Sequence, residues 1–181
     1  MTAISFSAGM IVTLSAWVLV KVLQYIKLKH FDWRQETREI FFLINLLVIV
    51  RFTFYPFSKA NGHVQPLLFD PATAFPFRVN LIPFVNLFDY DGSIRDILIN
   101  IPGNIAMFIP TGVMLPLIYK QLNSMKKVVF TGFLMSLCIE IIQLPFSVRA
   151  SDVDDLILNT LGCLLGYGIY VLFNNILLRH D

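Results

Sequence analysis

Charged residues are scarce in this sequence, and their scarcity excludes an ordinary soluble domain. Only 14% of the 181 residues are charged, against about a quarter in soluble globular proteins. Hydrophobic residues make up 56% of the chain, and the mean hydropathy is +0.70. A chain of this kind is solvated mainly by lipid. We therefore expect an all-α fold in which one domain, residues 1–181, is embedded in a membrane.

Histidine and cysteine are also rare, which narrows the chemistry. His30 and His180 lie at one expected membrane edge and His63 in a loop, so no histidine cluster is expected to hold zinc or activate a serine. Cys138 and Cys163 fall in long apolar runs, where a thiol usually packs as a small apolar side chain. The sequence has no glycine-rich phosphate-binding loop. Its net charge of +2 is too small and scattered to favour nucleic acid as a partner.

Five apolar stretches are long enough to cross about 30 Å of hydrocarbon. They cover residues 4–26, 40–57, 97–119, 128–146 and 153–178. Lys21 lies near the end of the first stretch, where its amine is expected to reach the membrane interface. No lysine or arginine precedes Lys21, so this stretch is predicted to be a retained helix rather than a cleaved signal peptide. The sequence therefore predicts a polytopic bundle of about five transmembrane helices.

Basic residues gather on one side of these spans. They occupy the links after the first and third spans and the residue after the fifth: Lys27, Lys29, Arg34, Arg38, Lys120, Lys126, Lys127 and Arg179. The positive-inside rule assigns that side to the cytoplasm. The N-terminus and the opposite, aspartate-rich side are then predicted to face outward, and the C-terminus inward.

The segment between the second and third spans, residues 58–96, is unusual. Four prolines interrupt it, so no long regular helix is expected. The segment is nevertheless rich in leucine and phenylalanine, which argues against a disordered linker. We expect an apolar loop, interfacial or partly re-entrant, that packs over the outer ends of the helices.

Polar side chains at membrane depth are costly, and in this chain they are expected near the outer ends of the spans. The set comprises Arg51, Asn100, Asn104, Glu140, Gln143, Arg149, Asp152, Asp154, Asp155 and Asn159 from the helices and the last link, with Arg78 and Asn80 from the proline-rich segment. The inner halves of the spans are expected to hold no such group. These positions predict a polar cavity that opens to the outer leaflet.

The residue types in this predicted cavity favour acid–base or binding chemistry. Glu140, Asp155 and Asp152 are candidate catalytic acids or bases. The arginines are candidate ligands of an anionic headgroup, and the amides would bind beside them. The oxygen-rich set would also suit Mg²⁺ or Ca²⁺, although the sequence establishes no cofactor.

Structural roles compete with these functional ones. Asp152 is placed to cap the last helix. Asn100 and Asn104, four residues apart, are placed to form interhelical hydrogen bonds. Arg51 is expected to neutralise Glu140 or an aspartate, because an unpaired carboxylate at that depth is expensive.

Four motifs between residues 78 and 162 resemble those of the VanZ-like family. They are Arg78–Phe84 (RVNLIPF), Asn100–Gly112 (NIPGNIAMFIPTG), Ser136–Gln143 (SLCIEIIQ) and Arg149–Gly162 (RASDVDDLILNTLG), and the match in order and spacing runs from about residue 77 to residue 168. The resemblance implies a small multi-pass protein of the bacterial plasma membrane. It also implies a role like that of the family's namesake, an accessory protein of glycopeptide-resistance clusters associated with low-level teicoplanin resistance.

Three functional hypotheses follow from the cavity and the resemblance. The leading one is a protein that binds or modifies a lipid-linked or cell-surface component and so reduces lipoglycopeptide action. The alternative is an enzyme that acts on a lipid headgroup, with Glu140 or Asp155 as the acid or base. A small lipid transporter is the third, disfavoured because the inner halves of the spans are expected to lack polar groups.

Overall fold

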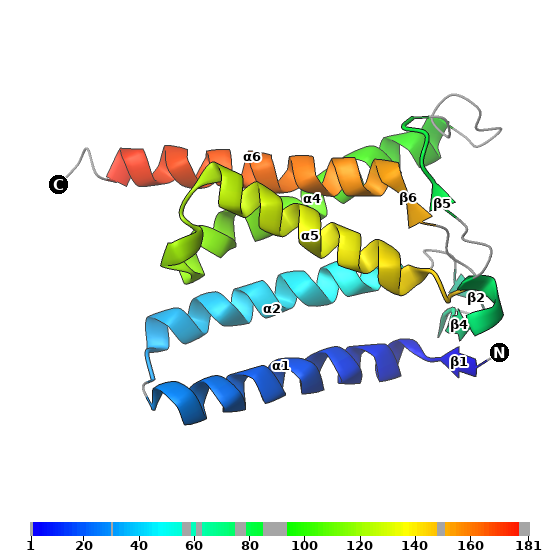
Figure 1. The fold of residues 1–181 in the computed structure, drawn as a ribbon, viewed down its shortest axis with the longest axis horizontal. Coiled ribbons are helices and arrows are strands. Elements are labelled where there is room, and N and C mark those ends of the chain that lie inside the picture. Colours follow the sequence, from blue (N-terminus) through cyan, green and yellow to red (C-terminus); the bar gives the residue numbers. More distant parts are fainter. Residues whose placement is uncertain are drawn as a thin grey trace.

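The structure, a computed structural model, is a bundle of long helices that run alternately in opposite directions (Figure 1). It describes residues 2–29, 31–55, 59–60, 63–74, 79–84, 94–147 and 151–177. Within these residues the long helices are α1 (Phe6–Leu28), α2 (Trp33–Phe54), α4 (Ile94–Ile118), α5 (Met125–Gln143) and α6 (Val153–Leu177). The predicted all-α bundle is confirmed.

Three helices among the described residues are long and apolar enough to cross a membrane. They are α1, α4 and α6, over Phe6–Lys27, Asn100–Ile118 and Val153–Ile176. Helices α2 and α5 carry more charge, including Glu39 and Arg51 in α2 and Glu140 in α5. A membrane protein is therefore supported, while a count of five spans stays a prediction.

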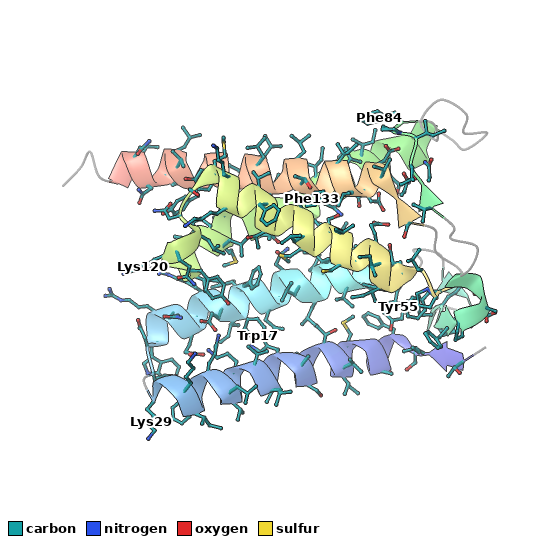
Figure 2. All side chains as sticks on the ribbon, in the orientation of Figure 1. Trp17, Lys29, Tyr55, Phe84, Lys120 and Phe133 are labelled. Carbon is teal, nitrogen blue, oxygen red and sulfur yellow. The ribbon has the colours of Figure 1, made fainter. Side chains whose placement is uncertain are left out.

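The links between successive helices lie at the two opposite ends of the bundle. The α1–α2 link lies at one end with the 3₁₀ helix η2 (Lys120–Leu122), and Figure 2 shows Lys29 and Lys120 there. We name this the basic end. The N-terminal strand and the α5–α6 link lie at the other, which we name the acidic end (Figure 1). This connectivity is the one expected from the sequence, and the direction of each end relative to the cell stays a prediction.

The segment between α2 and α4 contributes short elements to the acidic end. They are β2 (Lys59–Ala60), β3 (His63–Val64), β4 (Leu67–Phe69), the 3₁₀ helix η1 (Pro71–Ala74) and β5 (Val79–Asn80), joined there by β1 (Thr2–Ile4) and β6 (Ser151–Asp152). Strand β4 pairs antiparallel with β1, and β5 pairs in parallel with β6. These pairings satisfy backbone groups of the strands that lie beside the helix ends. The described part of the segment thus packs over the ends of the helices, as predicted.

Helices α4 and α6 approach each other closely because small residues face the partner backbone. A Cβ atom added to Gly112 would lie 2.2 Å from the carbonyl oxygen of Cys163, and one added to Gly166 would lie 2.1 Å from that of Ile109. Gly162, on α6, is the third glycine at which an added Cβ would meet the partner backbone. Small residues of this kind allow helix backbones to pack tightly in a membrane. This contact fixes the two helices that carry much of the predicted site.

A polar contact in the middle of the bundle joins α2 to α4. The Thr111 hydroxyl donates to Asn45 Oδ1 at 2.6 Å, and Asn45 Nδ2 donates to the carbonyl oxygen of Met107 at 2.9 Å. Thr111 is fully buried. The two side chains and one carbonyl therefore satisfy each other away from water.

A second polar cluster lies at the basic end, so the expectation that the inner halves lack polar groups is wrong. Lys21 Nζ lies 2.7 Å from Glu36 Oε1 and 2.7 Å from Glu39 Oε2. Gln35 Nε2 donates to the other Glu39 oxygen at 2.9 Å. Lys21 is thus ion-paired between α1 and α2. The sequence prediction failed because α2 begins at Trp33 rather than at residue 40, which brings both glutamates into the helix.

Candidate functional site

One face of α5 supplies the centre of the site at the acidic end. Ser136, Glu140 and Gln143 follow a spacing of four and three residues, which places them on the same side of a helix. All three are buried. The face points into the bundle, so its polar groups must find partners on neighbouring elements.

Glu140 connects the end of α5 to the chain that precedes α6. Its Oε2 accepts the backbone N–H of Asp152 at 3.0 Å, and its own carbonyl oxygen accepts the Ser151 hydroxyl at 2.7 Å. Only 7% of Glu140 is exposed. A buried carboxylate is thus held by an uncharged backbone donor.

Arg51 does not provide the expected ion pair with Glu140. The salt bridges found among the described residues both involve Lys21. Arg51 Nη1 instead donates to the carbonyl oxygen of Tyr55 at 3.0 Å, and its guanidinium lies 5.7 Å from the Phe6 ring centroid. Arg51 extends toward α1 and the end of α2 because aromatic faces there attract a cation.

Asp152 and Asp154 tie the segment before α4 to the start of α6. Asp152 Oδ1 accepts the backbone N–H of Asp154 at 3.0 Å and the Asn80 amide at 3.2 Å. Asp154 Oδ1 accepts the backbone N–H of Phe84 at 2.8 Å. Asp152 therefore makes the helix-capping contact weighed from the sequence.

We expect Asp152→Ala to lower the free energy of unfolding by about 1 kcal/mol, because helix caps contribute about that much. Asp152→Asn should retain most of this stability, since its amide oxygen can still accept the Asp154 N–H. Thermal unfolding of both variants in the same detergent would measure the difference. An alanine variant as stable as the wild type would contradict the capping role.

A deeper layer of the site joins α4, α5 and α6. The Asn104 amide donates to Asp155 Oδ1, which links α4 to α6. Asn159 Nδ2 donates to the Ser136 hydroxyl at 2.9 Å, which links α6 to α5. Asn159 is 1% exposed, and among the described residues its Oδ1 is the buried side-chain atom that has no hydrogen-bond partner. An unsatisfied buried acceptor is uncommon in folded proteins and calls for a donor.

Gln143 and Asn100 do not join the hydrogen bonds of this deeper layer. Gln143 Nε2 donates to the carbonyl oxygen of Thr53 at 2.6 Å and so joins α5 to α2. Asn100 is exposed, one turn before Asn104 on α4. Arg78 and Arg149 lie outside the described residues.

Ser136 and Ser151 belong to the site but were not predicted. Ser136 precedes Glu140 by four residues, so helical spacing was a usable signal. Ser151 precedes α6 in a link, where no helical spacing rule applies.

The described residues contain no group of three or more His, Cys, Asp or Glu side chains placed to hold a metal ion. Glu140, Asp152, Asp154 and Asp155 each accept a hydrogen bond from an N–H donor instead. In this part of the structure the carboxylates therefore belong to a network of hydrogen bonds.

Comparison with known proteins found similarity in sequence. A family model described as VanZ/LLP1 matches residues 42–174. Protein VanZ of Enterococcus faecium is 35% identical over 96 residues, covering 53% of this chain and 54% of that protein. The chain thus spans about half the length of this curated relative. No solved structure matches the chain.

Proposed function

This chain belongs to the VanZ/LLP1 family, and from that premise we propose that it reduces lipoglycopeptide action by binding a lipid-linked or cell-surface component at its acidic end. The membership confirms the resemblance carried by the four motifs. In this proposal the protein lies in the bacterial plasma membrane. The acidic end faces the exterior, because the basic residues at the other end favour the cytoplasm.

The observation that carries the proposal is the buried acceptor of Asn159. Polar side chains that serve only to join helices would be expected to satisfy one another. Here Asn159 Oδ1 has no partner among the described residues, although the neighbouring Ser136 and Asn104 are bonded. A ligand that presents an N–H or O–H donor, such as the amide or hydroxyl of a cell-wall precursor, would supply the missing hydrogen bond to Asn159 Oδ1. Arg78 and Arg149 would hold an anionic part of the same ligand.

An enzymatic version is favoured by the environment of Glu140. Its carboxylate is buried without a salt bridge among the described residues, and a group in such a place is suited to acid–base work. Glu140 or Asp155 would then act on the headgroup. This version predicts a chemically altered precursor in expressing cells. Mass spectra of lipid-linked precursors that match those of control cells would count against it and leave the binding version.

Transport is less well supported, even though the inner halves contain polar groups. Ile49, Phe108 and Cys163 form a buried apolar cluster. Along α4, Phe108 lies between Asn104 of the site and Thr111 of the mid-bundle contact. An apolar layer of this kind would separate the polar groups rather than connect them.

The test is teicoplanin killing of a sensitive bacterium that expresses the protein. We expect the wild type to raise survival and Glu140→Gln to reduce survival to that of empty-vector cells, because glutamine keeps the shape and removes the charge. Asn175→Ala, an exposed position near the end of α6, serves as the matched control and should protect fully. Equal membrane levels of the three proteins must be shown by immunoblot. Full protection by Glu140→Gln would show that the site takes no part in the protection.

A further inference from the structure

Helix α1 is fastened to the bundle near its two ends. At the acidic end the Tyr55 hydroxyl donates to the carbonyl oxygen of Ser5 at 3.1 Å. At the basic end Lys21 forms its ion pairs with α2. No residue of Phe6–Lys27 is buried. The rest of the bundle therefore covers α1 only in part, with Trp17 packed against the cluster that includes Phe42 of α2.

A cavity of about 930 Å³ lies between α1 and α2 beside the basic-end attachment. Its size is within the range of ligand pockets in proteins. Trp17, Tyr25 and Phe31 supply aromatic surface, and Figure 2 shows Trp17 on the α2 side of α1. Val18 and Val22 extend this surface along α1, where both are exposed. The apolar wall thus continues from the cavity to the outside of a helix that is apolar enough to span a membrane.

The polar lining of this cavity carries excess negative charge. Asp32, Glu36 and Glu39 contribute three carboxylates, and Lys21 contributes one ammonium group. Three negative charges and one positive charge leave a net charge of −2. Glu39 is 2% exposed, so its charge is poorly screened by water. A second cation would be stabilised here by the carboxylates and by the faces of the aromatic rings.

We propose that this cavity binds an aminophospholipid from the leaflet at the basic end. The lipid ammonium lies against Glu36 and the aromatic rings, and the acyl chains follow the apolar surface of α1. A lipid fits better than a soluble amine because Val18 and Val22 continue the wall toward the hydrocarbon. This site lies at the opposite end from the one assigned to the proposed function, and it stands independently of it.

Bromolipid quenching of tryptophan fluorescence tests this proposal directly. Trp17 and Trp33 are the two tryptophans of the chain, so Trp33→Phe leaves Trp17 as the reporter inside the cavity. The full-length Trp33→Phe protein is placed in vesicles that contain either phosphatidylethanolamine or phosphatidylglycerol with brominated acyl chains. We expect the ethanolamine lipid to compete for the Trp17 site about threefold better than the glycerol lipid, since cation–π and ionic contacts of this type are modest.

The preference should fall to about one in Glu36→Gln, which removes a carboxylate. It should also fall in Phe31→Leu, a variant at an exposed loop position that is expected to fold even if the first does not. Equal quenching by the two lipids in the parent protein would overturn the proposal, as would a preference that survives both substitutions. Displacement of the bromolipid by soluble ethanolamine would show that a free amine occupies the cavity, and would equally overturn it.

Discussion

Gly166→Val is expected to destabilise the bundle by about 3 kcal/mol, at the upper end of the cost of overpacking a core. The added Cβ would lie 2.1 Å from the carbonyl oxygen of Ile109 and 2.9 Å from Gly112 Cα. Both are backbone atoms of α4, so no side-chain rotation can relieve the clash. The two helices must separate, and they then lose the close packing that holds a membrane bundle together. Thermal unfolding followed by size-exclusion chromatography in detergent would measure the loss.

Gly168→Val provides the matched control for this result. It adds the same side chain to the same helix, two residues away, at an exposed position with nothing within 4 Å. We expect its unfolding temperature to stay close to that of the wild type. If both valine variants unfold at the same temperature, helix propensity rather than the contact with α4 determines the effect.

Lys21→Leu should cost about 2 kcal/mol of stability, because it leaves the buried Glu39 carboxylate without a cation. Removal of one partner from a fully buried ion pair costs about 3–5 kcal/mol. The expected value is lower here because 23% of the Lys21 side chain is exposed and water screens part of the interaction. The midpoint of thermal unfolding in detergent is the measurement.

The double variant Lys21→Leu/Glu39→Leu should recover most of the lost stability. Two apolar side chains of suitable size can replace a buried ion pair with little net cost. Glu39→Leu alone should have a small effect, since Lys21 keeps its 2.7 Å contact with Glu36. A double variant as unstable as Lys21→Leu would show that the fold needs both charges themselves.

The helices were predictable because each depends on a local property of the sequence. Stretches such as Val153–Leu177 are apolar over the length needed to cross a bilayer. The position of the site followed from similar local rules. Asp152, Asp155 and Asn159 recur at helical spacing at the start of one span, and the structure places the last two on the helix and Asp152 at its cap.

Partner choice could not be predicted, because it depends on distances between helices. Arg51 was expected from charge alone to pair with Glu140 or an aspartate, yet it does not pair with Glu140 and extends toward Tyr55 and Phe6. Lys21 was expected to reach the interface, because no local pattern indicates that α2 brings Glu36 and Glu39 beside it. The depth of a charged side chain in the membrane is therefore easier to predict from a sequence than the residue that it contacts.

The attachment of α1 near its two ends has a consequence for how this protein can change over evolutionary time. The matched family range begins at residue 42, after this helix. Apolar positions in the middle of α1, such as Ile11 and Leu14, are exposed and are expected to meet lipid. Drift among leucine, isoleucine, valine and phenylalanine at such positions should be nearly neutral. Gly9 differs, because a Cβ there would lie 2.0 Å from the Tyr55 hydroxyl oxygen. Related proteins should therefore tolerate wide variation along this helix while they retain its anchoring residues.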